Sequence, residues 1–348
     1  MRKTALFICY AFLFSTSCVD PFKIPNLPFD AGLLVVDGFI NSGAGSTTTI
    51  KLSRSMALND NGKVRSELKA KVMVEADDNS TYSLIDKGSG TYSSTLNINP
   101  ALKYRLRIKT STGGEYLSDF VEVKHTPPID SVTYQIDKSQ HGLGIYVNTH
   151  DSEKVARNYH WEFIETWEYH ADCNNTRLAV QTWKCWRSEN SGKILFSSTA
   201  RLEVDTINHF PLTFIDANSI KLGVTYSILV KQYAVTEDGL SYLQQLKKST
   251  EPQGSIFDPQ PGKVTGNFHC LSDVNEPVLG YLFVNNGVEK RIFIRTLPNW
   301  FFKIPFFLAC SDPLNPGFPI ACSNPPASAC SDCRVGGGVI VRPDFWID

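Results

Sequence analysis

Short runs of alternating apolar and polar residues fill most of the chain between residues 33 and 123. The clearest is YRLRIKT (104–110), in which Tyr104, Leu106 and Ile108 alternate with basic residues. A period of two places successive side chains on opposite faces of a strand. Similar runs, separated by Gly, Asn and Asp turns, occupy 33–40, 47–55, 69–76, 81–86, 90–98 and 116–123. About seven strands at this spacing predict an immunoglobulin-like or fibronectin-like β-sandwich over residues 32–126.

Longer strand-like runs follow Pro127 and Pro128, which interrupt strand pairing. The runs are GIYVNTHD (144–151), YHWEFIETWEYH (159–170), TYSILVKQYAV (225–235), LGYLFVNN (279–286) and KRIFIRTL (290–297). Leu240, Leu243 and Leu246 form one stripe between them and predict a single helix over 237–249. The pattern therefore predicts a mainly β protein of two β-sandwich domains in series. The second sandwich spans 127–309, with this helix as an insertion, and a cysteine-rich tail over 310–348 packs on it.

The first eighteen residues have the pattern of an export signal. Two basic residues precede an apolar run at 5–14, which is too short for a bilayer span of about 20 residues. A run of small residues then precedes Cys18, as in bacterial lipoprotein signals, although Ser15 stands where an aliphatic residue is usual. We predict a signal peptide over 1–17, a lipid anchor on Cys18 and a proline-rich tether over 18–31. Ordinary cleavage without lipid is the alternative.

Composition narrows the function classes. Lys and Arg number 34 and Asp and Glu 35, so the formal net charge is −1. That balance argues against nucleic-acid binding through bulk positive charge. The sequence contains no G-x-S-x-G, H-E-x-x-H or P-loop pattern. We therefore expect a non-catalytic protein without a cofactor.

Nine cysteines are present, and disulfides are the default expectation in an exported protein. Cys173 and Cys185 bracket a polar turn between two strands, and we expect them to pair with each other. Cys270 is left over as a buried free thiol, with a reactive nucleophile as the alternative. Two further disulfides, in any of three connectivities, are expected among the four cysteines of the tail: Cys310, Cys322, Cys330 and Cys333.

The run at 159–170 offers candidate chemistry. His160, Glu162, Glu168 and His170 share one face of a regular strand, which allows a metal or acid–base site. The two histidines would lie roughly 33 Å apart, too far to share one ion. We therefore expect no metal site, with the charges in water and the opposite aromatic face in the core.

A second candidate is a run of aromatic residues near residue 300. It forms either a core strand with a capping loop or a partly exposed lip that meets a ligand or partner. The residues of this run are Trp300, Phe301, Phe302, Phe306 and Phe307.

Several segments resemble, in order and spacing, an uncharacterised lipoprotein family of the Bacteroidetes, known as a domain of unknown function. The segments are ETWEY (165–169), KCW (184–186), LKKSTEPQGSIFDPQPGKVTGNF (246–268), VLGYLFV (278–284), KRIFIR (290–295) and DCRVGGGVIVRPDFW (332–346).

The resemblance implies an outer-membrane lipoprotein encoded beside a TonB-dependent receptor, and it supplies no catalytic residues. We therefore expect a lipid-anchored accessory protein that helps this receptor capture or take up its ligand. We favour display on the cell surface over a periplasmic orientation. A surface adhesion or structural module, or a hydrolase acting on the imported substrate, are the alternatives.

Overall fold

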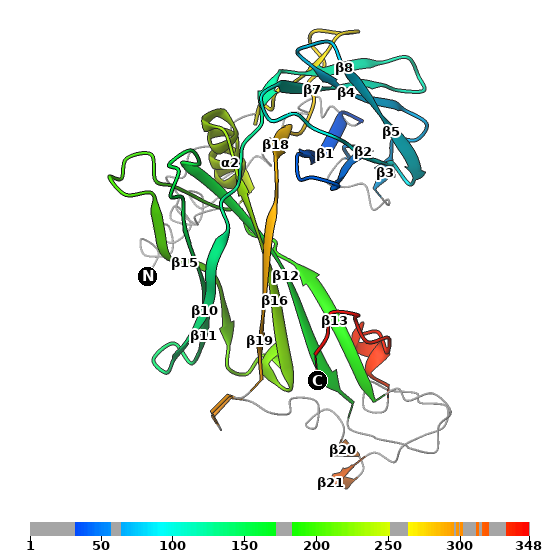
Figure 1. Ribbon diagram of the computed structural model, residues 1–348. Coiled ribbons are helices and arrows are strands. Elements are labelled where there is room, and N and C mark those ends of the chain that lie inside the picture. The colour runs from blue at the N-terminus through cyan, green and yellow to red at the C-terminus, as the bar shows by residue number, and fades with distance from the viewer. Residues whose placement is uncertain are drawn as a thin grey trace, which may run out of the picture.

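Strands dominate the structure, a computed structural model (Figure 1). Among the residues that it describes, the single α-helix is α2 (Glu237–Thr250), close to the range predicted from sequence. The prediction of a mainly β protein is confirmed. Figure 1 shows an upper group of strands above a lower group of longer ones. The described residues are 32–56, 64–171, 183–250, 264–295, 297–298, 300–301, 311–312, 315–319 and 332–347.

The upper group is an eleven-stranded sheet with the order β17-β8-β7-β4-β5-β6-β2-β1-β18, in which β3 also pairs with β2 and β9 with β7. Alternate residues such as Leu34, Val36 and Ile40 point into its hydrophobic core, which we call the first core. The strands are β1 (Leu34–Asn41), β2 (Thr47–Arg54), β3 (Arg65–Ser66), β4 (Lys71–Ala76), β5 (Thr81–Gly88), β6 (Thr91–Thr95), β7 (Lys103–Lys109), β8 (Glu115–Ser118), β9 (Val121–Glu122), β17 (Phe268–Cys270) and β18 (Phe283–Asn285).

Two strands of this sheet come from a distant part of the chain. β17 pairs with β8, and β18 pairs in parallel with β1. Phe268, Leu282 and Val284 are buried in the first core. The sequence pattern predicts residues 268–285 as part of the second sandwich, whereas β17 and β18 pair with strands of the upper sheet. The reason is that the apolar side chains of these short strands bury against the first core.

The lower group contains a five-stranded and a three-stranded sheet, whose buried side chains form one cluster, the second core. The five-stranded sheet has β12 (Asn158–His170) paired with β13 (Lys184–Asn190), β14 (Leu195–Ser198) and β16 (Thr225–Ala234), and β16 with β19 (Val288–Ile294). The other comprises β10 (Ile129–Asp137), β11 (Gly142–His150) and β15 (Thr206–Asp216). A separate hairpin joins β20 (Ser311–Asp312) and β21 (Asn315–Pro319).

The aromatic face of β12 lies in the second core, as predicted, with Trp161 fully buried. The carboxylates differ from the prediction. Glu165 is buried, its Oε2 lies 2.6 Å from Lys221 Nζ, and its Oε1 accepts a 2.8 Å hydrogen bond from Tyr226 Oη. Glu168, expected in water, is also buried. A buried carboxylate is tolerated when cations and hydroxyl groups compensate its lost hydration.

The buried Glu168 helps to hold the C-terminal segment 332–347. Its Oε1 lies 2.7 Å from His170 Nε2 and 2.9 Å from Lys184 Nζ, and its Oε2 accepts a hydrogen bond from Trp346. The hydrogen bonds from His170 and Lys184 outweigh burial, which acts in the opposite direction, and lower the pKa of Glu168. The segment therefore covers a carboxylate that stays charged.

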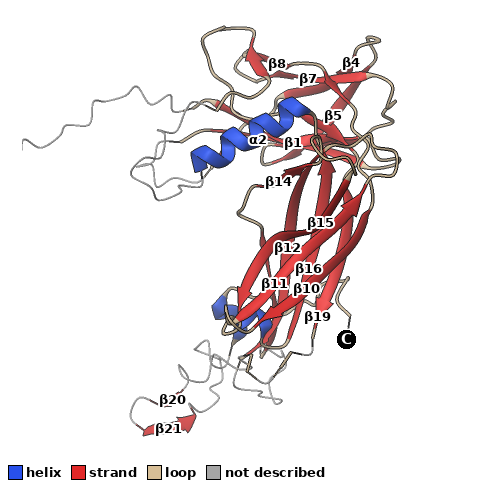
Figure 2. Ribbon diagram, turned by 90° about the vertical axis from the view of Figure 1, so that its left-hand side faces the viewer, coloured by secondary structure: helices blue, strands red, loops and turns tan. Residues whose placement is uncertain are grey.

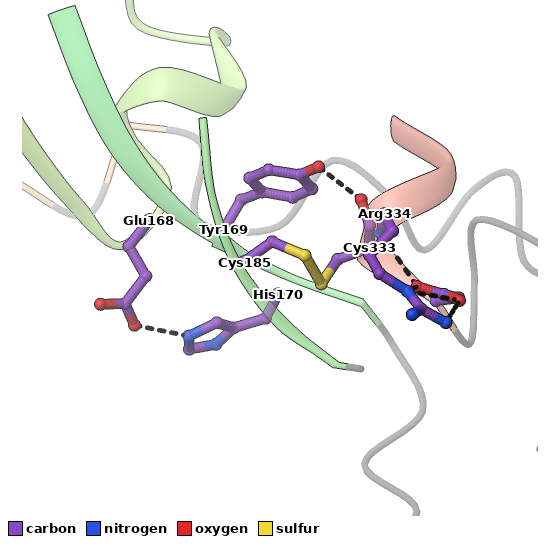
Figure 3. The surroundings of a disulfide bond; sticks show 7 residues. Glu168, Tyr169, His170, Cys185, Cys333 and Arg334 are labelled. Carbon is purple, nitrogen blue, oxygen red and sulfur yellow. Dashed lines mark hydrogen bonds and ion pairs between the residues drawn. A yellow bond between two sulfur atoms is a disulfide. The ribbon is translucent and has the colours of Figure 1, made fainter. Parts of the chain in front are cut away.

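A disulfide joins Cys185 of β13 to Cys333 in the C-terminal segment (Figure 3). Beside it, Tyr169 Oη donates a 2.5 Å hydrogen bond to the carbonyl of Cys333. The expected pairing of Cys173 with Cys185 was therefore wrong, as was the expectation of two disulfides within the tail. Proximity in sequence misled the prediction, because the C-terminal segment returns to β13.

Of the other half-cystine candidates, Cys173, Cys310, Cys322 and Cys330 lie outside the described residues. Cys270 is a buried free cysteine, as expected.

We predict that replacing Lys221 by Met will lower the free energy of unfolding by about 3–5 kcal/mol, because it leaves Glu165 charged and buried without its cation. Lys231→Met is the matched control, since Lys231 pairs with the half-exposed Glu289 and should change stability by less than about 1 kcal/mol. Urea denaturation of both variants measures the difference. Equal losses of unfolding free energy would show that the buried Lys221–Glu165 pair stabilises the fold no more than the Lys231–Glu289 pair does.

We predict that the double variant Cys185→Ala/Cys333→Ala will be less stable than the wild type by about 2–5 kcal/mol. The bond closes a long loop and so restricts the unfolded chain. Denaturation without reductant gives the value, and peptide mapping should recover Cys185 linked to Cys333. Cys173→Ala serves as the control and should leave that link intact; its loss in this variant would contradict the pairing.

Candidate functional site

A cavity of about 320 Å³ lies where the upper and lower groups of strands meet, beside α2. Figure 2 shows α2 crossing this level of the molecule near β1. We call the cavity the junction pocket. Five separate segments line it: 36–39, 160–162, 191–194, 233–246 and 280–285.

One wall of the junction pocket is the outer face of β1 and β18. These strands run in parallel with Phe39 opposite Phe283. Ile40 and Val284, their neighbours, point the other way into the first core. The same two strands therefore close the first core on one face and present aromatic side chains to the pocket on the other.

Gly280 permits the close approach that this wall requires. Its φ is +128°, and a β-carbon there would overlap the backbone carbonyl of Val36. Leu279 exchanges two backbone hydrogen bonds with β1. The amide of Val36 donates to the carbonyl of Leu279 at 2.8 Å, and the amide of Leu279 donates to the carbonyl of Leu34 at 2.9 Å. Glycine is suited to a position with positive φ and a neighbouring backbone in contact. It sets the position of Tyr281, which follows it in the wall.

The opposite wall is α2. Thr236 caps the helix, since its Oγ1 accepts a 3.0 Å hydrogen bond from the amide of Gly239. Gly239 is buried, and a β-carbon there would come within 2.8 Å of the Phe283 ring. Leu243 is buried on the same side and lines the pocket. Because Gly239 has no side chain, the first turn of α2 packs directly on the ring of Phe283.

Aromatic rings line much of the junction pocket. Phe39 meets Tyr233 edge to face with centroids 5.1 Å apart, and Tyr242 stacks on Tyr281 at 5.1 Å. Tyr281 also lies 4.8 Å from Phe283. These spacings are within the range of favourable aromatic pairs. They form a rigid apolar surface of the kind that binds flat or apolar parts of a ligand.

His160 and Glu162 lie close together near the start of β12 and line the junction pocket. His160 Nδ1 contacts the carbonyl of Leu195 at 2.8 Å, and because a carbonyl only accepts, this nitrogen carries the proton. His160 Nε2 lies 3.5 Å from a Glu162 carboxylate oxygen. The hydrogen bond from His160 lowers the pKa of Glu162, while burial and the charge of Glu162 raise that of Tyr233. The pocket therefore keeps a carboxylate charged beside neutral phenols.

Most candidates from the sequence lie elsewhere. Trp300 is partly buried against the second core and Phe301 fully buried in it, so for Phe301 the ligand-lip alternative was wrong and the core alternative correct. The ring of Phe301 finds partners in Trp300 and the core, which favours burial over exposure. Phe302, Phe306 and Phe307 lie outside the described residues, as does Cys18.

The sequence pattern points to His160 and Glu162 but not to the rest of the junction pocket. A signal was present, because Asp37 interrupts an aliphatic run in which its neighbour Val36 is buried. That signal shows a strand with two different faces. It does not show that residues near 281 and 242 meet it.

Across the described ranges, no group of three or more His, Cys, Asp or Glu side chains is placed to hold a metal ion. Within the same ranges, no helix combines the length and the apolar composition needed to cross a membrane.

The fold and the pocket define a β-rich protein with an aromatic cavity at a junction between sheets. Residues 19–291 match the model of one protein family, and the chain belongs to that family, the domain of unknown function DUF4249. The uncharacterised family expected from the sequence motifs is thereby confirmed at this level. A search of curated proteins found no match.

A solved structure titled "Cytokine receptor complex - Crystal form 2" is 8% identical, with 58% of this chain and 90% of that chain covered and a TM-score of 0.20. A likeness at that score carries no argument.

We predict that Gly280→Ala will lower the free energy of unfolding by about 3 kcal/mol or more, because the new methyl group meets the Val36 carbonyl at a strained φ. Gly113→Ala is the matched control: its φ is +96° but nothing lies within 4 Å of the added carbon, so about 1–2 kcal/mol is expected. Thermal and urea denaturation compare the two. Equal losses would mean that φ alone, and not the contact with β1, explains the glycine.

Proposed function

We propose that this protein is a non-catalytic accessory lipoprotein, anchored in the outer membrane through Cys18, that partners a TonB-dependent receptor in ligand capture or uptake. The observation that carries the binding role is the junction pocket, a cavity of small-molecule size lined by aromatic rings and a few polar groups. The receptor partnership rests on the sequence resemblance described above.

The position of the pocket supports a role close to a membrane. The first described strand, β1, forms one wall of the pocket and follows the tether over 18–31 directly in sequence. A tether of this length extends at most roughly 50 Å. A lipid on Cys18 would therefore hold the pocket strand within reach of a receptor in the same membrane.

Two separate hydrophobic cores would fit this role. The first and second cores are separate clusters, and the pocket lies between the groups of strands that enclose them. Ligand sites occur preferentially at such junctions.

A hydrolase is the second candidate, favoured by the approach of His160 to Glu162 in the pocket. An imidazole beside a carboxylate is able to act as a general base. This candidate requires that His160→Gln and Glu162→Gln each abolish a hydrolytic activity of the wild type. Our proposal expects no such activity in a broad hydrolase screen.

The experiment that tests the proposal is a mild-detergent pull-down of the full-length protein from its native outer membrane. We expect the wild type to recover a TonB-dependent receptor. Cys18→Ala should leave the membrane fraction and recover none, because it lacks the lipid attachment site. Cys9→Ala, a matched change within the signal, should behave as the wild type.

Wild-type protein that reaches the membrane but recovers no receptor would overturn the partnership and favour an adhesion or structural role. Membrane retention of Cys18→Ala equal to that of the wild type would overturn the lipid anchor.

A further inference from the structure

The junction pocket contains a buried hydrogen-bond acceptor without a partner. Asn285 lines the pocket and is 1% exposed. Its Nδ2 donates to the carbonyl of Ala234 at 3.1 Å, which fixes the orientation of the amide. Its Oδ1 has no hydrogen-bond partner among the residues that the structure describes. Buried acceptors are normally paired, so this oxygen indicates a donor that a ligand would supply.

Two carboxylates accompany this acceptor. Asp37 lies on the pocket side of β1, and within the described part of the chain its carboxylate has no hydrogen bond or ion pair. Glu162 faces His160 at 3.5 Å, longer than the 2.7–2.9 Å of a close charge-assisted bond. The lining therefore carries two carboxylates and one lysine, Lys193, and this lysine is exposed.

The aromatic lining favours the same kind of ligand. A cation over an aromatic face is stabilised by about 0.5–2 kcal/mol, more when water is excluded. Burial and the nearby charge of Asp37 raise the pKa of Tyr242, so the two side chains lie near each other. The Tyr242–Tyr281 pair thus adjoins the unpaired carboxylate.

We propose that the junction pocket binds small molecules through a primary alkyl ammonium group, which donates to Asn285 Oδ1 and lies among Asp37, Glu162 and the aromatic rings. This inference rests on the ligand-binding role proposed above and names its chemical class. The volume of about 320 Å³ is at the lower end of small-molecule sites, which favours a compact amine.

Three probes that share a butyl chain separate charge from hydrogen bonding. n-Butylammonium has both, n-butyltrimethylammonium has charge without a donor, and n-butanol has a donor without charge. Binding to the full-length protein in a non-ionic detergent is measured by calorimetry and by saturation-transfer NMR. We expect n-butylammonium to bind about tenfold more tightly than either other probe, the size of one charge-assisted hydrogen bond.

Asp37→Asn removes the charge with almost no change of shape, and among the described residues the exposed carboxylate has no structural partner to lose. We expect n-butylammonium to bind this variant about tenfold more weakly and n-butanol to bind it unchanged. Asp130→Asn is the matched control, because Asp130 pairs with His150 on β11, away from the pocket. It should leave all three probes unchanged.

Equal binding of the three probes would overturn the ammonium inference and leave the pocket as a binding site of another class. Unchanged n-butylammonium binding in Asp37→Asn, or no n-butylammonium binding to the wild type at millimolar concentration, would also overturn it. The pull-down of the receptor decides the proposed function separately.

Discussion

The parallel pairing of β18 with β1 is the contact on which the rest of the molecule depends. It places Phe39 opposite Phe283, two residues that are far apart in the sequence. Without it, Leu282 and Val284 would leave the first core open. The pairing also fixes where β19 begins, because β19 follows β18 and continues into the lower sheet (Figure 1). One strand pairing therefore couples the two groups of strands and forms the pocket between them.

A shared strand face explains why stability and binding are linked here. Residues of β1 and β18 alternate between the first core and the pocket, so a shift by one residue would exchange the two sets. The register is held by burial on the core side and by the backbone contact at Gly280. The pocket side carries polar groups such as Asp37 and Asn285.

Charged groups in the lower sheet and at the junction pocket are paired differently. Away from the pocket, Glu165 and Glu168 are buried with their cations and hydrogen-bond donors in place. At the pocket, Asp37 has no such partner within the described chain, and the Oδ1 of Asn285 is unpaired. Carboxylates whose hydrogen bonds and cations are all in place indicate a structural role. Unpaired acceptors around a cavity are groups to which a ligand would donate hydrogen bonds.

The local elements can be predicted from the chain alone, because they follow from side-chain periodicity: the alternation at 104–110 forms β7, and the leucine stripe at 240–246 forms α2. The same alternation predicts which face of β12 is aromatic and buried. The contacts between distant segments, namely β18 with β1 and Cys185 with Cys333, become visible when the chain is folded. Those contacts depend on how whole sheets bury their apolar faces, and no local pattern along the chain encodes that choice.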